Sequence, residues 1–101
     1  MPKLRLTFTT GVVLQSIAQG YRYGFDIMDV SGLPDGTVYP ALRRLEDAGI
    51  LVSEWEDEET AGKRPARCYY ALTADGEQML ADARGKFPAL QWAIGQPVEE
   101  A

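Results

Sequence analysis

The clearest hydrophobic pattern in the sequence lies in residues 35–48. Its apolar positions recur at the spacing of one face of an α-helix, and they are Val38, Leu42 and Leu45. The opposite face carries Tyr39, Arg43 and Arg44. A helix of this length is only marginally stable by itself in water, so the elements before and after it must hold it in place. The pattern therefore predicts a short helix with one anchored face and one face offered to a partner.

Capping residues mark both ends of this helix. Asp35 and Thr37 are both good N-caps, and Thr37 would place Pro40 in the first turn, where its missing N–H costs nothing. We expect the helix to begin between these two residues. Gly49 can adopt the left-handed conformation that closes a helix, so the end is expected near Ala48.

Two further helices are predicted before this one. The first is capped by Thr9 or Thr10 and runs to about Gln19. The second spans residues 25–30, and its core candidates are Phe25, Ile27, Met28 and Val30. Residues 31–36 are rich in turn formers and connect it to the central helix. A helix, a tight turn and another helix form the supersecondary unit that many DNA-binding proteins use.

Two strands are predicted after the central helix. Residues 50–55 and 67–72 alternate apolar and polar side chains, which is typical of half-buried β-strands. The residues between them, 56–66, are acidic first and basic second, and they include Gly62 and Pro65. This composition suits the exposed tip of a β-wing.

A last helix is predicted from Ala74, with Thr73 as its cap. Its apolar residues continue beyond Pro88, which ends or kinks the helix near Phe87. This stripe is larger than the core of one 101-residue chain readily hides, so we expect a second copy of the chain to cover it. The candidate dimer contacts are Met79, Leu80, Ala83, Phe87, Leu90, Trp92 and Ile94.

Length and composition exclude several classes of protein. With 101 residues, 46% of them hydrophobic, the chain is predicted to be one small globular domain. It shows neither a membrane-spanning apolar run nor a signal-peptide pattern, so a cytoplasmic location is expected. Cys68 is the single cysteine and histidine is absent, which excludes a Cys/His metal site and histidine base catalysis. No serine has a base partner and no Gly-rich phosphate loop is present, so we predict neither an enzyme nor a cofactor.

The distribution of charge matters more than its total. The net charge of −5 opposes a polyanionic partner. However, residues 60–70 hold cations and no acid, as do residues 1–22. The acids gather in residues 54–59, a run without the spaced ligands of a calcium loop, and a solvated surface is the simpler interpretation. Local basic patches can therefore still contact DNA.

A series of short motifs extends from the central helix into the last one. They are residues 36–46 (GTVYPALRRLE), Gly49, Trp55, residues 67–73 (RCYYALT) and Gly76. In order and spacing they resemble the winged helix-turn-helix of the PadR family of transcriptional regulators, and the resemblance covers residues 6–85. Residues 23–27 match the family's entry to the second helix.

The resemblance implies a mainly α-helical fold with a small β-wing. Residues 1–73 would form the winged helix-turn-helix, with a three-helix DNA-binding unit and a two-stranded wing. Residues 74–95 would form a C-terminal dimerisation helix, and residues 96–101 a frayed tail. Family members usually carry a longer, unbroken helix at this end, so Pro88 leaves the dimer geometry open.

The implied function is sequence-specific DNA binding by a transcriptional regulator. We expect a repressor that binds double-stranded DNA, at a near-palindromic operator, as a homodimer. The alternative is a winged-helix module whose acidic surface binds protein and not DNA. Phe87 and Trp92 are also candidates to line a pocket for a small aromatic effector, as in drug-sensing members of the family, or to form part of the dimer interface instead.

The candidate DNA contacts combine cations with hydroxyl groups. They are Tyr23, Thr37, Tyr39, Pro40, Arg43, Arg44, Lys63, Arg64 and Arg67. Guanidinium groups suit guanine edges and phosphates, whereas hydroxyl groups bond phosphates. Alternatives remain open for each group. The helix arginines can instead be solvated and paired with Glu46 or Asp47, Tyr39 can be a half-buried core ring, and the wing cations can simply balance the acidic run.

Overall fold

The elements of the chain follow the predicted order with two additions. A computed structural model describes residues 5–94. Its elements are α1 (Phe8–Ala18), α2 (Gly24–Ser31), α3 (Asp35–Asp47), β1 (Leu51–Trp55), α4 (Glu58–Ala61), β2 (Cys68–Leu72), α5 (Ala74–Lys86) and α6 (Leu90–Ala93). The predicted frayed tail, residues 96–101, lies outside the described residues. The short helices α4 and α6 are the additions.

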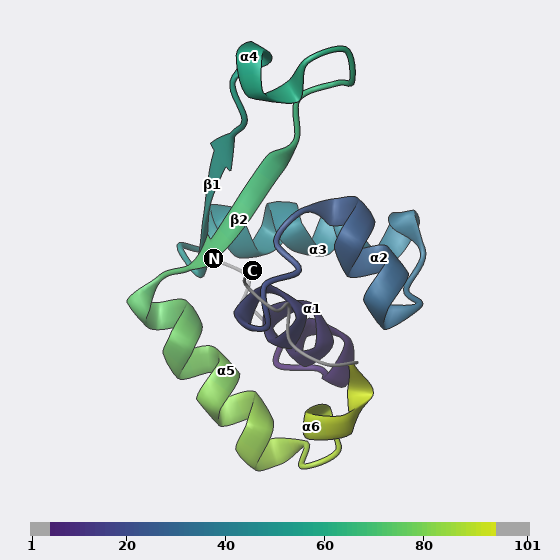
Figure 1. Ribbon diagram of the computed structural model, residues 1–101. Coiled ribbons are helices and arrows are strands. Elements are labelled where there is room, and N and C mark those ends of the chain that lie inside the picture. Colours follow the sequence, from purple (N-terminus) through teal and green to yellow (C-terminus); the bar gives the residue numbers. More distant parts are fainter. Residues whose placement is uncertain (1–4, 95–101) are drawn as a thin grey trace.

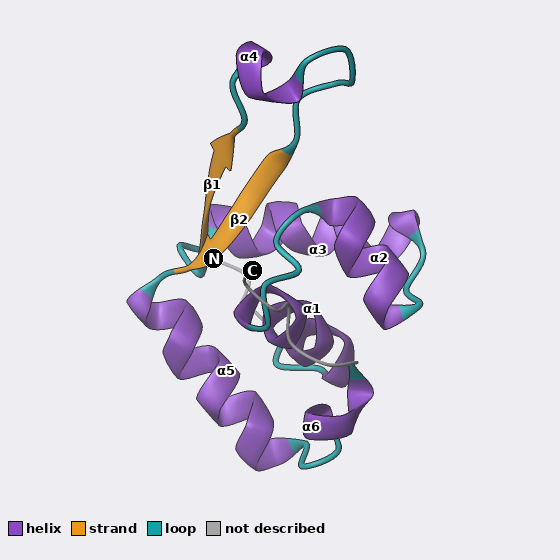
Figure 2. Ribbon diagram, viewed as in Figure 1, coloured by secondary structure: helices purple, strands orange, loops and turns teal. Residues whose placement is uncertain are grey.

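The helix α1 lies at the centre of the helical part, and α2, α3, α5 and α6 pack around it (Figure 1). The strands β1 and β2 form a two-stranded ribbon that projects away from the helices, with α4 at its far end (Figure 2). This arrangement is a winged helix, so the predicted fold class is confirmed.

The predicted bounds of the central helix are confirmed, but the predicted N-caps are wrong, because neither Asp35 nor Thr37 caps it. α3 begins at Asp35 after its N-cap Pro34, so Pro40 lies inside the helix and not in its first turn. At the other end Gly49 has a φ of 78°, and the Ile50 N–H donates to the Leu45 carbonyl at 2.9 Å. This is the left-handed closure expected of a glycine after the last turn.

The apolar face of α3 is buried in the main core. This core joins Val38, Ala41, Leu42 and Leu45 to Val13, Leu14 and Ile17 of α1. Burial of one such aliphatic side chain contributes about 1.5–3 kcal/mol to folding. The predicted stripe is therefore the anchor that fixes the orientation of α3.

Two details at the N-terminal end correct the prediction. Thr7 caps α1, because its backbone is extended and its hydroxyl accepts a hydrogen bond from the Thr10 N–H at 3.1 Å. Thr9 and Thr10 are already helical, so neither is the cap. Phe25 is not a core residue, since 63% of it is exposed on the side of α2 away from the buried Ile27.

The wing is a regular antiparallel ribbon. Its register pairs Leu51 with Leu72 at one end and Trp55 with Cys68 at the other. The Ser53 hydroxyl donates to the Glu46 carboxylate and so connects β1 to α3. At the predicted wing tip, Asp57 accepts a hydrogen bond from the Thr60 N–H at 2.6 Å and caps α4, a short helix that the composition did not predict.

The C-terminal segment is capped by Thr73, as predicted, and is bent at Pro88. α5 ends at Lys86, and α6 folds back onto α1 (Figure 1). The premise that one chain cannot hide this apolar stripe is wrong for four of its residues, which are buried in the chain's own core: Leu80, Ala83, Leu90 and Ile94. Met79 and Phe87 are half-buried, and 76% of Trp92 is exposed.

No helix among residues 5–94 is long and apolar enough to cross a membrane.

The anchoring of α3 predicts a sharp contrast between two neighbouring residues. Leu42→Ala should lower the free energy of unfolding by about 2–5 kcal/mol, because it leaves a cavity in the core. The matched control Arg43→Ala should change it by no more than about 0.5 kcal/mol, because Arg43 is exposed. Urea unfolding of both variants measures this, and similar losses for both would contradict the burial of this face.

Candidate nucleic-acid interface

The outward face of α3 carries the residues that the sequence singles out. Tyr39, Pro40, Arg43 and Arg44 are exposed, and Thr37 is half-buried. Successive helical residues are about 100° apart, so Arg43 shares a flank with Tyr39, while Arg44 lies on the other flank with Thr37. Within residues 5–94 neither arginine forms an ion pair with Glu46 or Asp47. Both guanidinium groups are therefore available on the surface.

Tyr39 is both exposed and packed. It is 47% exposed, yet its ring lies directly against the backbone of Gly24 at the start of α2. A Cβ atom at position 24 would come within 2.4 Å of the Tyr39 ring, so any other residue there would displace the ring. The contact holds the ring between α2 and α3. Tyr39 is therefore half-packed, as one alternative predicted, and still exposed enough to contact a partner, as the other requires.

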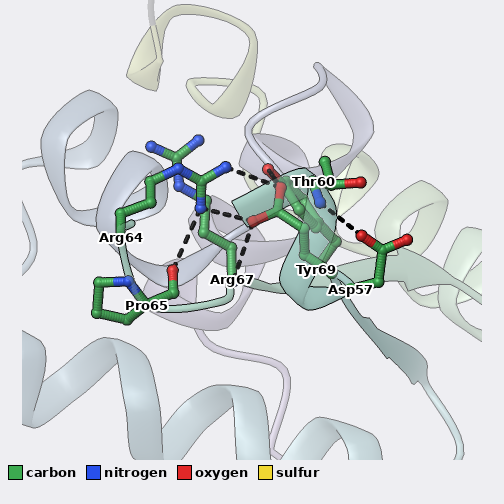
Figure 3. A network of polar contacts seen from close by, with 7 residues as sticks. Asp57, Thr60, Arg64, Pro65, Arg67 and Tyr69 are labelled. Carbon is green, nitrogen blue, oxygen red and sulfur yellow. Dashed lines mark hydrogen bonds and ion pairs between the residues drawn. The ribbon is translucent and has the colours of Figure 1, made fainter. Parts of the chain in front are cut away.

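A carboxylate organises the part of the wing where the chain leaves β1 and returns to β2. Glu56 receives hydrogen bonds from both terminal nitrogens of Arg64, at 2.5 and 2.9 Å, and longer ones at 3.4 Å from the Arg67 N–H and the Tyr69 hydroxyl. Its side chain is only 7% exposed. Figure 3 shows Arg64, Arg67 and Tyr69 converging on this network, with Asp57 and Thr60 beside it. The hydrogen bonds from Arg64 lower the pKa of Glu56 below its ordinary value of 4.5.

The three wing cations therefore differ in availability. Arg64 is held by Glu56, which matches the alternative that a wing cation balances the acidic run. Arg67 lies over the Tyr23 ring, with its guanidinium carbon 4.4 Å from the ring centroid. Lys63 is exposed and forms no ion pair with any described residue. The structure thus brings Tyr23 and Arg67 together and leaves Lys63 free.

Three residues that line one depression of this surface were not among the DNA contacts predicted from the sequence: Arg22, Glu56 and Tyr69. Glu56 belongs to an acidic run, and its pairing with Arg64 depends on the path of the wing between the strands. Tyr69 lies in a predicted strand, and Arg22 in a predicted basic segment. The strand alternation was the available signal for Tyr69. For Glu56 the sequence indicated only that a wing cation could balance the acidic run, and not which residues would pair.

Phe87 and Trp92 do not form a shared pocket wall in the described residues. The Phe87 ring packs edge-to-face against Phe8, with ring centroids 5.7 Å apart, while Trp92 faces solvent. An open depression lies instead at the wing, at the opposite end of the molecule from α6 (Figure 1). An effector at Phe87 and Trp92 stays a prediction.

The arrangement is shared with known proteins. The family model described as "Transcriptional regulator PadR-like family" matches residues 13–82, which is more than half of the chain. This chain belongs to the PadR-like family. No curated protein matches the sequence of this PadR-like chain.

Solved structures of similar fold include other PadR proteins. A PadR family transcription regulator from Clostridium difficile R20291 has a TM-score of 0.71 and 23% identity, over 85% of this chain and 93% of that one. A PadR-like transcription factor from Bacteroides fragilis has a TM-score of 0.67 and 26% identity, over 82% of both chains. The circadian clock associated protein Pex from Anabaena has a TM-score of 0.68 and 20% identity, over 88% and 82%. The first and third of these likenesses, below 25% identity, show the shared fold alone.

The Glu56 network predicts an acid-sensitive wing. Because the pKa of Glu56 is lowered on folding, its contribution to stability is complete above the ordinary value of 4.5 and is lost as the pH falls through the lowered folded value. The melting temperature of the parent should therefore fall between neutral and acid pH, and that of Glu56→Gln should fall less over the same range. Asp57, whose pKa is also lowered by its bonds to Thr60, contributes equally in both proteins. Parallel pH profiles for the two proteins would contradict the ion pair.

Proposed function

We propose that this PadR-like regulator binds specific DNA sequences as a homodimer and represses transcription from a near-palindromic operator. The observation that supports it most is the division of α3 into a buried face and an outward face that carries Tyr39, Arg43 and Arg44. A helix with its side chains is about 10–12 Å across and the major groove is about 12 Å wide, so such a face can reach base edges.

Each candidate contact has a role set by its chemistry. Arg43, near the middle of the outward face, is suited to a guanine edge. Arg44, Thr37 and the Tyr39 hydroxyl are suited to phosphates on either side of the groove. Pro40 adds an apolar surface between them. Base recognition is thus assigned to Arg43, and the other residues set the register.

The wing would add contacts beside the recognition helix. Lys63 is free to reach a phosphate, and Arg67 is held on Tyr23. Arg64 must leave Glu56 before it contacts DNA, so we assign it the smallest share of the three cations. The sequence alone gave no reason to prefer one of these three residues. Their contacts favour Lys63 and Arg67 over Arg64 as phosphate contacts.

A homodimer would suit the paired half-sites of a near-palindromic operator. A two-fold axis would place two copies of α3 about 34 Å apart, which is one turn of DNA. In the C-terminal segment the apolar surface left for a second copy is the exposed Trp92 with the half-buried Met79 and Phe87, and the exposed Phe8 packs on Phe87. An exposed tryptophan is typical of an interface.

The central contact can be tested by one substitution. Arg43→Ala should weaken binding to the operator by about 1–3 kcal/mol, because it removes a base contact and leaves the fold intact. The operator is first selected from random DNA with the purified protein, and affinities are then measured by fluorescence anisotropy. Lys86→Gln, which removes one positive charge from the far end of α5, is the control. Equal affinities for the parent and Arg43→Ala would remove Arg43 from the interface.

The same affinity measurement, repeated at several salt concentrations, distinguishes a DNA-binding regulator from a protein-interaction module. DNA binding weakens steeply as salt rises, because phosphates release counterions, whereas an apolar protein interface does not. A parent protein without salt-dependent DNA binding would favour the protein-interaction module.

The dimer is tested at Trp92. Light scattering of the parent should report twice the monomer mass, and Trp92→Asp should report one monomer mass with an unchanged thermal unfolding curve at low concentration. A chain that ends at Lys86 is a poorer test, because it lacks the core residues Leu90 and Ile94. A monomeric parent that binds operator tightly would contradict this account.

A further inference from the structure

The side of the wing that lies against residues 22 and 23, here called the wing root, carries a stack of alternating cationic and aromatic side chains. We define the wing-root stack as Arg22, Tyr69, Tyr23 and Arg67. The Arg22 guanidinium carbon lies 6.0 Å from the Tyr69 ring centroid, and the Arg67 carbon lies 4.4 Å from that of Tyr23. The two rings meet edge-to-face at 5.6 Å. Each ring thus faces one cation and the other ring.

Backbone pairing fixes this stack in place. Tyr23 forms an antiparallel bridge with Tyr69, so residues 22 and 23 run beside β2. The Tyr70 N–H donates to the Arg22 carbonyl at 2.7 Å, and Arg22 Nε donates to the Tyr70 carbonyl at 2.9 Å. Arg22 is held at Nε while its exposed terminal nitrogens have no partner among residues 5–94. A side chain that is already ordered loses less entropy when it binds.

Carboxylates lie near Arg22, but most are already engaged. Arg22 shares the open depression at the wing, about 380 Å³ in volume, with Glu54, Glu56 and Asp57. Glu56 is paired with Arg64, and Asp57 caps α4. Glu54, which lies opposite Tyr69 in the register, is exposed and has no partner among the described residues. The surface therefore combines the free terminal nitrogens of Arg22 with the Arg67 guanidinium, which already contacts Tyr69 and Tyr23, and with one uncommitted carboxylate.

The stack is continuous with the outward flank of α3. Tyr23 is followed by Gly24, whose backbone contacts the Tyr39 ring. The contacts therefore run from Tyr39 on α3 to Tyr23 and on to Arg67 on the wing. A duplex seated on α3 would have its nearest backbone beside this surface.

We propose that Arg22 and Arg67 form a DNA-backbone contact at the wing root, which takes phosphodiester groups and reads no base. This inference rests on the proposed function. Guanidinium groups pair with phosphate in a bidentate fork, and phosphate contacts position a protein without carrying sequence information. Tyr23 and Tyr69 are positioning residues, because their rings hold the two guanidinium groups.

The first test is the salt dependence of binding for Arg22→Gln. Affinities are measured on the selected operator and on a mixed-sequence duplex of equal length. The variant should lose the same factor in affinity on both duplexes, and the slope of log K against log salt should fall by about one. Arg22→Lys should keep most of the slope, and Lys86→Gln should keep all of it.

The second test uses the opposing charge. Glu54→Gln should raise the affinity on both duplexes, because it removes a repulsion beside the phosphate path. Glu54 has no described partner, so this variant leaves the fold intact and gives a result even if Arg22→Gln unfolds the wing. An unchanged affinity for Glu54→Gln would overturn the contact.

The third test separates positioning from direct contact at Tyr23. Tyr23→Phe keeps the ring and should bind as the parent does, whereas Tyr23→Leu should lose affinity on both duplexes. Equal losses for the two variants would show that the hydroxyl matters and the stack does not.

The outcomes distinguish this inference from the function on which it rests. A parent that shows no salt-dependent binding to either duplex contradicts both. A parent that binds with a steep salt slope, together with an Arg22→Gln variant of the same slope, overturns only the wing-root contact.

Discussion

The packing of the apolar face of α3 against α1 is the interaction on which the rest of the structure depends. It buries Val38, Leu42 and Leu45 beside Leu14 and Ile17, and so decides which side chains of α3 point outward. The left-handed Gly49 then turns the chain directly into β1, and the Ser53 hydroxyl ties that strand to Glu46 of α3. The orientation of the wing is therefore set by the orientation of α3.

An acidic chain that binds DNA must manage its own charge. The net charge of −5 repels a duplex at long range, so loose binding is disfavoured and close contacts have to be well placed. In the structure Tyr23 supports Arg67, whereas Arg64 is already paired with Glu56. A cation that is ordered without being neutralised, as Arg67 is, loses less entropy on contact with a partner.

Much of the fold was predictable because its signals are local. The period of Val38, Leu42 and Leu45, the Gly49 closure and the Thr73 cap each depend on residues within a few positions, and the structure confirms all three. The alternation of β1 and β2 is equally local. The family resemblance then supplied the arrangement of these elements, which no single pattern contains.

The remaining features depend on contacts between distant segments. Pro88 predicts a break, but not that α6 folds back to bury Leu90 in the core of its own chain. The Glu56–Arg64 pair and the stacking of Arg22 on Tyr69 require the path of the wing and its pairing with residues 22 and 23. The sequence pattern also made Phe25 a core candidate, which is wrong, because in a short helix the neighbouring elements decide which residues are buried.

The most direct test of the central claim maps the DNA-contacting surface in solution. Backbone amide NMR signals of the protein are compared before and after addition of the selected operator duplex. The account predicts shifts concentrated in the outward positions of α3, in residues 22–24 and in residues 63–67, with small changes in the first two turns of α5. Shifts confined to the acidic helix α4, or an undisturbed α3, would contradict it.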